Sequence, residues 1–164
     1  AFAIQYWRQF QIPSIIVRAA AQIGIGQPPF FAISNFCKQI AEIEKGKKKP
    51  IIYVGNLKAE RGFVAVTDMV RAYWLAIQKG RPCEIYNVGS LYVKPMGEWL
   101  CKLLTLTKIN IEVQTDPARK RLLEAPRLII NSGKFRKLTG WRETISPENL
   151  FKDVLDWWRS RVRS

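Results

Sequence analysis

The stretch VGNLKAERGFVAVTDMVRAYWLAIQKG, residues 54–80, holds the pattern that decides the fold class. Phe63 to Val66 alternates as a strand does, and the residues after it follow a helical period. Thr67 or Asp68 is placed to cap that helix, because a short oxygen-bearing side chain accepts hydrogen bonds from free amides. We predict that the helix ends at Gly80. Its predicted buried face consists of Met69, Val70, Tyr73, Trp74 and Ile77.

Strands and helices alternate on both sides of this stretch. Before it we predict a helix over 2–10, a strand over 14–17, a glycine-bearing turn, a helix over 30–43 that stops at Gly46, and a strand over 51–54. After it we predict a strand from Glu84, a helix from Pro95, a strand over 109–113, an extended piece over 128–130 and a short helix from a Ser132 cap to Gly140. This alternation favours an α/β class with parallel strand pairing.

The last predicted helix has the clearest local signals. Ser146 is its expected cap, and Pro147 stands in the first turn, where a missing N–H costs nothing. Its buried stripe is Leu150, Phe151, Val154, Leu155 and Trp158. We also expect Trp74 and Trp99 to lie in the core.

Composition excludes several classes of protein. No apolar run approaches the ~20 residues of a membrane span. The chain begins without Met or a signal-peptide pattern, so we expect it to be part of a longer protein. Cys37, Cys83 and Cys101 are odd in number and widely spaced, which predicts reduced thiols and a cytoplasmic protein. Histidine is absent, so Ser-His-Asp and Cys-His catalysis are excluded within this chain, and no metal site is predicted.

The chain is strongly basic, with a net charge of +14 at pH 7. Such a surface attracts anions: nucleotide phosphates, nucleic acid or an acidic protein. The alternative interpretation is a solvated exterior that is simply basic.

Residues 54–80 resemble the C-terminal half of the extended short-chain dehydrogenase/reductases, and more narrowly the GDP-mannose 4,6-dehydratases and GDP-4-keto-6-deoxymannose reductases. Further blocks agree in order: FAISNFCKQIAEIEKG (31–46), EIYNVGS (84–90), DPARKRLLEAP (116–126) and KFRKLTGW (134–141). The resemblance implies a single partial domain over 1–164. In this partial domain, the last part of a Rossmann-type sheet would be formed by residues of about 1–30 and 51–90. The helix over 30–46, between these ranges, would belong to the substrate domain. The small mixed α/β sugar-nucleotide-binding part, with the C-terminal helix, would be formed by about 91–164.

The resemblance implies that this chain is the substrate-binding portion of a GDP-sugar dehydratase or reductase, and leaves open which. NADP or NAD would be the cofactor of the full-length family. The family's glycine-rich cofactor turn and its Tyr-x-x-x-Lys pair are absent, since Tyr6 is followed four residues later by Phe10. We therefore assign no catalytic residue, and we expect no activity or cofactor binding by this chain alone. The partners implied are a GDP-sugar or another nucleotide-sugar, and the N-terminal half or a second copy of the chain.

Seven residues match positions that bind ligands in the family. Arg61 and Arg121 match the family's diphosphate-binding arginines. Arginine suits this role because its guanidinium can donate two hydrogen bonds to phosphate oxygens. Glu124 matches the acid that accepts hydrogen bonds from ribose hydroxyls. Asn35 and Lys38 lie on the helix that lines the same cleft. Arg18 and Ala19 match backbone beside the nicotinamide.

Three features support an alternative function: the charge of +14, the absence of the family's N-terminal half, and Ala21, which stands where the family has an Asn that contacts substrate, so that polar contact is lost. Gly62 stands where the family usually has Asp. The alternative is a catalytically dead basic scaffold that binds nucleic acid or an acidic partner. Asn56 and Asp68 are interpreted as structural, in a turn and as a helix cap.

Overall fold

A computed structural model describes residues 2–119 and 124–162. The helices are α1 (Phe2–Phe10), α2 (Ala32–Glu44), α3 (Val66–Lys79), α4 (Met96–Leu104), α5 (Gly133–Thr139) and α6 (Pro147–Arg161), with a 3₁₀ turn η1 (Pro117–Arg119). The strands are β1 (Ile16–Ala19), β2 (Ala21–Ile23), β3 (Ile51–Val54), β4 (Glu60–Ala65), β5 (Ile85–Val88), β6 (Val93–Pro95) and β7 (Glu112–Thr115). Strands and helices alternate, which confirms the predicted α/β class.

Parallel pairing dominates the short sheets. Among the described residues, β1 pairs with β5 and β3 with β7, both in parallel. The third sheet has the order β2-β4-β6, in which β2 and β4 are parallel and β4 and β6 antiparallel. Within these ranges β1 has β5 as its one strand partner, so its other edge is unpaired.

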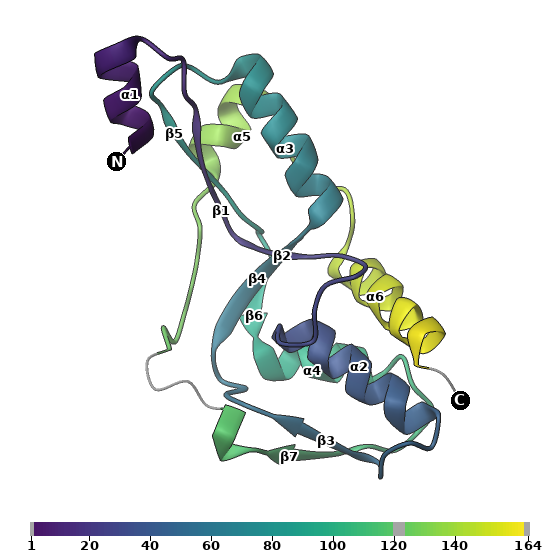
Figure 1. Cartoon of the computed structure of the whole chain (residues 1–164). Coiled ribbons are helices and arrows are strands. Elements are labelled where there is room, and N and C mark those ends of the chain that lie inside the picture. Colours follow the sequence, from purple (N-terminus) through teal and green to yellow (C-terminus); the bar gives the residue numbers. More distant parts are fainter. Residues whose placement is uncertain (1, 120–123, 163–164) are drawn as a thin grey trace.

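Two hydrophobic cores lie on either side of β4. The first is built mainly from α2, α4, α6 and β3, and the second from α3, α5, β1 and β5. Figure 1 shows these two groups at opposite ends of the molecule, with β4 running between them. Successive side chains of a strand point to opposite faces, so Val64 of β4 belongs to the second core while Phe63 and Ala65 belong to the first.

Helix α6 matches its prediction closely. The Ser146 hydroxyl accepts a hydrogen bond from the Asn149 amide at 3.3 Å, and Pro147 is the first helical residue. The predicted apolar stripe is buried except for Trp158, which is half-buried and donates its indole N–H to the Ser34 hydroxyl. Local capping and periodicity therefore fix this helix.

The predicted cap of α3 is wrong. The residue before the helix is Ala65, and no side chain caps this end. Asp68 instead lies in the first turn, 2% exposed, and its carboxylate accepts hydrogen bonds from the Thr144 amide at 2.8 Å, the Thr144 hydroxyl at 2.6 Å and the Ile145 amide at 3.1 Å. Burial raises the pKa of Asp68, but these hydrogen bonds and the nearby Arg71 outweigh it and hold the pKa below its ordinary value.

The predicted buried face of α3 is also largely wrong. Met69 is buried, together with Ala72 and Ala76, whereas Trp74 is 59% and Ile77 is 69% exposed. Val66, Val70 and Tyr73 lie on the same exposed side, at the i, i+4 and i+7 positions of one helical stripe. Helix α3 thus has an apolar flank beside its core-facing side, and we call the residues Val66, Val70, Tyr73, Trp74 and Ile77 the α3 flank.

Several other elements differ from their predictions. The strand expected over 14–17 is β1, two residues later, and the one expected over 109–113 is β7, whose register is set by pairing Glu112 with Ile51. The expected extended piece over 128–130 contributes a backbone hydrogen bond from Leu128 to Glu60. The Ser132 side chain does not cap α5 but bonds to both the N–H and the C=O of Gly89.

Across the described residues, each helix is too short or too polar to span a lipid bilayer.

Candidate functional site

A cavity of about 520 Å³ lies between α2, the loop after β3, β4 and the segment around η1. This volume is typical of small-molecule sites, which are mostly apolar with a few polar groups. Its polar lining consists of Asn35, Asn56, Arg61, Arg119 and Glu124. Its apolar lining includes Phe30, Phe31, Tyr53, Leu57, Phe63 and Met96.

Arg61 and Glu124 meet on one wall of this cavity, although 63 residues separate them in sequence. The Arg61 Nη2 lies 3.3 Å from the Glu124 Oε1 and also donates to the Ala125 carbonyl oxygen at 2.8 Å. The Asn56 amide nitrogen donates to the other Glu124 oxygen at 2.9 Å. Asn56 also has the predicted turn role, since its Oδ1 accepts a hydrogen bond from the Lys58 amide.

β4 and the segment after Glu124 hold Arg61 in place. Pro126 accepts a hydrogen bond from the Glu60 amide at 2.7 Å, and the Arg61 Nη1 donates to the Glu60 carbonyl oxygen at 2.8 Å. The Arg61 side chain is 18% exposed. Because it is half-enclosed and paired with a carboxylate, it presents a fixed positive group rather than a freely solvated one.

Packing is tight around Gly62, which stands where the family pattern has Asp. In the register of β4 and β6, Gly62 faces Val93. A Cβ on Gly62 would lie 3.0 Å from both the Tyr92 carbonyl oxygen and the Val93 Cγ2, and 3.2 Å from the Ser90 Cβ. A larger side chain at this position would therefore require the neighbouring strand to shift.

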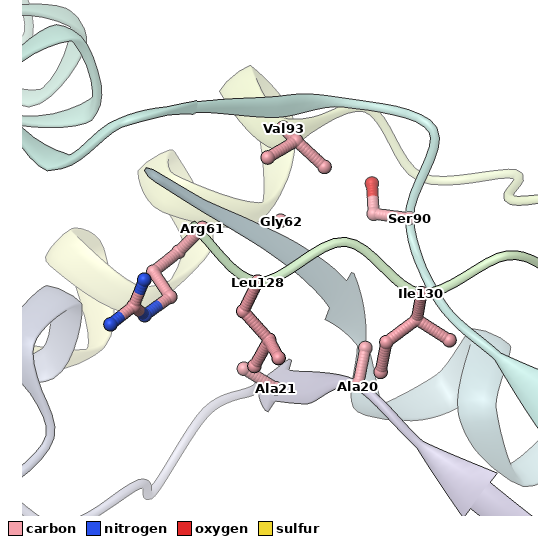
Figure 2. A pocket seen from close by; sticks show the side chains of 8 residues that line it. All are labelled: Ala20, Ala21, Arg61, Gly62, Ser90, Val93, Leu128 and Ile130. Atoms are coloured by element: carbon pink, nitrogen blue, oxygen red, sulfur yellow. The ribbon is translucent and has the colours of Figure 1, made fainter. Parts of the chain in front are cut away.

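A second, much smaller cavity adjoins the first through Ala21 and Arg61. It measures about 10 Å³, which is room for one water molecule at most. Figure 2 shows Leu128 and Ile130 extending toward Ala21 and Ala20, while the Arg61 side chain points away from Ser90. This hollow is too small for a substrate group.

The structure separates the other predicted site residues. Asn35 lines the large cavity, but Lys38 does not, and its ammonium lies over the Trp158 ring and 3.8 Å from Glu42. Arg121 lies outside the described residues. Arg18 is exposed on β1, and Ala19 packs against the second core, so neither lines a described cavity.

The glycine-bearing loop after β2 serves a turn. Gly26 has a φ of +83°, which favours glycine, and Gly24 lets the chain approach Val66 closely. The Gln27 side chain donates back to the Gln22 carbonyl oxygen at 2.8 Å. Ala21, the first residue of β2, lies at the cavity and offers no side-chain donor there.

Two residues of the site were not predicted from the sequence. Arg119 lines the cavity and donates to the Asn35 Oδ1 at 2.7 Å. Gln39, which is 4% exposed, donates to the same oxygen at 2.7 Å.

Cys37 on the same helix is no nucleophile, because burial raises the pKa of its thiol to about 12 and keeps it protonated near neutral pH.

The fold defines an α/β protein of the NAD-dependent epimerase/dehydratase class. The chain belongs to the family described as GDP-mannose 4,6 dehydratase, which its residues 1–154 match. The GDP-6-deoxy-D-mannose reductase of Pseudomonas aeruginosa is 30% identical over 149 residues, covering 91% of this chain and 49% of the relative. The human dTDP-D-glucose 4,6-dehydratase is 28% identical over 168 residues, covering 99% of this chain and 46% of the relative.

Solved structures agree with this membership. The structure of RMD from Pseudomonas aeruginosa complexed with NADPH superposes with a TM-score of 0.91 at 25% identity, covering 98% of this chain and 53% of that one. A dTDP-glucose 4,6-dehydratase from Bacillus anthracis in complex with NAD gives a TM-score of 0.76 at 26% identity, covering 97% and 49%. The chain thus spans about half the length of the relatives it matches.

Proposed function

We propose that the large cavity binds the nucleotide of a GDP-sugar, and that the chain is the substrate-binding portion of a GDP-mannose dehydratase or a GDP-4-keto-6-deoxymannose reductase. The observation that carries this proposal is the meeting of Arg61 and Glu124 on one cavity wall. The two residues come from separate sequence blocks, and each matches a nucleotide-binding position of the family. The family membership and the cavity volume of about 520 Å³ support the same ligand class.

The proposed chemistry of binding is an exchange of partners. A diphosphate offers Arg61 a charge-assisted, bidentate acceptor in place of one carboxylate oxygen. The Glu124 carboxylate, released on one side, can then accept hydrogen bonds from ribose hydroxyls, because an ionised carboxylate is an acceptor only. Asn56 holds the other Glu124 oxygen and keeps the carboxylate at the cavity wall.

The residues present do not fit a complete dinucleotide site. Arg18 is exposed and Ala19 is packed in the second core, and neither lines a described cavity. The 164 residues also contain no Tyr-x-x-x-Lys pair. We therefore expect the chain alone to bind nucleotide without turnover.

The proposal includes a protein partner that completes the fold. The α3 flank is apolar and exposed, and β1 has an unpaired edge among the described residues. A large exposed apolar surface marks an interaction site in a soluble protein. We infer that the other half of the family fold covers this surface, with a second copy of the chain as the alternative occupant.

Thermal denaturation with added nucleotides tests the binding proposal. At a GDP concentration 100 times its Kd, binding adds about 2.7 kcal/mol of stability, or roughly 5–10 °C in Tm for a domain of this size. We expect Arg61→Ala and Glu124→Gln to abolish the shift, and Arg81→Ala, an exposed arginine outside both cavities, to retain it. A comparison of GDP with dTDP reports which base the cavity prefers.

The scaffold alternative predicts a different result. A chain that binds nucleic acid through its charge of +14 would show no GDP shift and would bind generic DNA with an affinity that falls steeply as salt rises. That pair of outcomes would contradict the nucleotide-sugar proposal.

A further inference from the structure

Hydrogen bonds to Asp116 anchor the backbone that carries Arg119. It ends the turn η1, whose first amides are satisfied by Asp116: the Ala118 amide donates to the Asp116 Oδ1 at 2.9 Å and the Arg119 amide to the Asp116 carbonyl oxygen at 3.0 Å. Asp116 is itself anchored, because its amide donates to the Val54 carbonyl oxygen at 2.8 Å. A Cβ on Gly55 would lie 2.7 Å from the Arg119 carbonyl oxygen, so the turn sits directly against that glycine.

A chain of hydrogen bonds from β3 fixes the Arg119 side chain. The buried Gln39 side chain bonds to both the N–H and the C=O of Tyr53, at 2.9 and 3.0 Å. Gln39 also donates to the Asn35 Oδ1, and the side-chain nitrogen of Asn35 donates to the Pro29 carbonyl oxygen at 2.8 Å. The same Asn35 oxygen accepts the Arg119 Nη1 at 2.7 Å. The guanidinium is thus held in one orientation before any ligand binds.

Resting on the proposed function, we infer that Arg119 is a further phosphate-binding residue of the large cavity. Its guanidinium has five N–H donors. The contacts to Asn35 and to the Asp116 Oδ2, at 2.7 and 3.2 Å, use one Nη1 donor and the Nε donor. The Nη2 edge, which these contacts do not involve, can bind an anion.

Arg61 is more fully engaged than Arg119. Its Nη1 donates to the Glu60 carbonyl oxygen, and its Nη2 donates to both Glu124 and the Ala125 carbonyl oxygen, so a phosphate that binds through Nη2 must displace one of these partners. Within residues 2–119 and 124–162, the Arg119 hydrogen bonds involve Nε and Nη1, so binding at Nη2 displaces neither of these partners. Pre-organised donors bind with a smaller entropic cost, so Arg119 is the better placed of the two described arginines to receive a phosphate first.

Two carboxylates moderate the positive charge at this position. Asp116 pairs with Arg119, and Glu124 lines the same cavity. The Asp116 carboxylate takes the Nε side of the guanidinium, which orients the group as well as partly neutralising it. Because both Arg61 and Arg119 line the cavity, the ligand expected here is a polyanion such as a diphosphate, which offers an acceptor to each arginine.

Calorimetric titration of the 164-residue chain with GDP, guanosine and inorganic pyrophosphate tests this inference. We expect Arg119→Ala to weaken GDP and pyrophosphate binding by about 10–100-fold and to leave guanosine binding unchanged. Arg119→Lys should still lose several-fold, because an ammonium cannot donate in a fixed fork. Gly55→Ala should weaken GDP binding by pushing the turn away, and Arg81→Ala is the matched control with wild-type affinity.

The outcomes separate this inference from the proposed function. If the wild type binds GDP and Arg61→Ala weakens binding while Arg119→Ala does not, the inference is overturned and the proposed function stands. If pyrophosphate binds through Arg119 but GDP does not bind, the anion site stands and the proposed function fails. If neither ligand binds the wild type, both are overturned. Thermal unfolding of each variant checks that the substitution leaves the chain folded.

Discussion

Removal of the Asp68 carboxylate is expected to destabilise the chain strongly. The carboxylate accepts hydrogen bonds from two amides, the Thr144 hydroxyl and the Arg71 Nη2, and it is 2% exposed. In Asp68→Ala the part-buried amides of Thr144 and Ile145 lose their charged acceptor, at about 1.5–3 kcal/mol each. With the lost charge-assisted bonds, and allowing for non-additivity, we expect a loss of about 3–5 kcal/mol in the free energy of unfolding.

Asp68→Asn should cost less. One amide oxygen can still accept from the two backbone amides, while its NH₂ group cannot accept from Arg71. Arg71 is 41% exposed at its side chain and can turn to water, so we expect a loss of about 1–2 kcal/mol. Asp153→Asn, an exposed carboxylate on α6, is the matched control and should lie within about 0.5 kcal/mol of the wild type.

The contribution of the Asp68 carboxylate to the free energy of unfolding decreases as the pH falls. The folded-state pKa is lowered, so the stabilisation is present above the unfolded pKa of about 3.9 and is lost as the pH falls through the folded value. Urea unfolding followed by tryptophan fluorescence measures the effect, since the Trp141 indole N–H donates to the Asp68 carbonyl oxygen. A difference between wild type and Asp68→Ala that stayed constant from pH 7 to pH 3 would refute the role assigned to the charge.

Two further predictions concern packing and thiol reactivity. Gly62→Ala should lower the free energy of unfolding by about 1 kcal/mol, because the new Cβ would lie 3.0 Å from the β6 residue Val93. Gly97→Ala in α4, where the nearest neighbours of a Cβ lie at 3.6 Å, should raise that free energy by up to about 1 kcal/mol. Equal effects of the two substitutions in urea unfolding would contradict this. Alkylation at pH 8 followed by mass spectrometry should modify the exposed Cys101 and spare the buried Cys37, and rapid modification of Cys37 in the folded chain would show that the helix opens.

The sequence predicted most reliably those features that depend on local contacts. Helix α6 has its cap, its first-turn proline and its buried stripe within a few residues of one another. The β5 strand and the αL ending of α5 at Gly140 likewise follow from short-range signals. The Arg61 and Glu124 positions came from the resemblance, and the structure brings the two side chains together.

Features that depend on distant contacts could not be predicted in this way. Asp68 is a residue of a type that often caps helices, and it lies near a helix start, but its partner Thr144 is 76 residues away in the sequence. Helical periodicity marks the apolar side chains of α3, yet it does not tell which of them another element covers. Arg119 belongs to a run of basic residues in the sequence, and only its contact with Asn35, 84 residues distant, distinguishes it from a solvated charge.

The position of β4 between two cores affects how the chain opens. The buried residues of the two cores form separate clusters, although β4 contributes to both, so we expect each core to open locally by itself. Trp99 lies in the first core and Trp141 in the second, so indole fluorescence reports two local equilibria that need not coincide. A nucleotide held in the large cavity, whose lining residues Phe36, Val54 and Met96 belong to the first core, would stabilise that half and leave the opening of the other half unchanged.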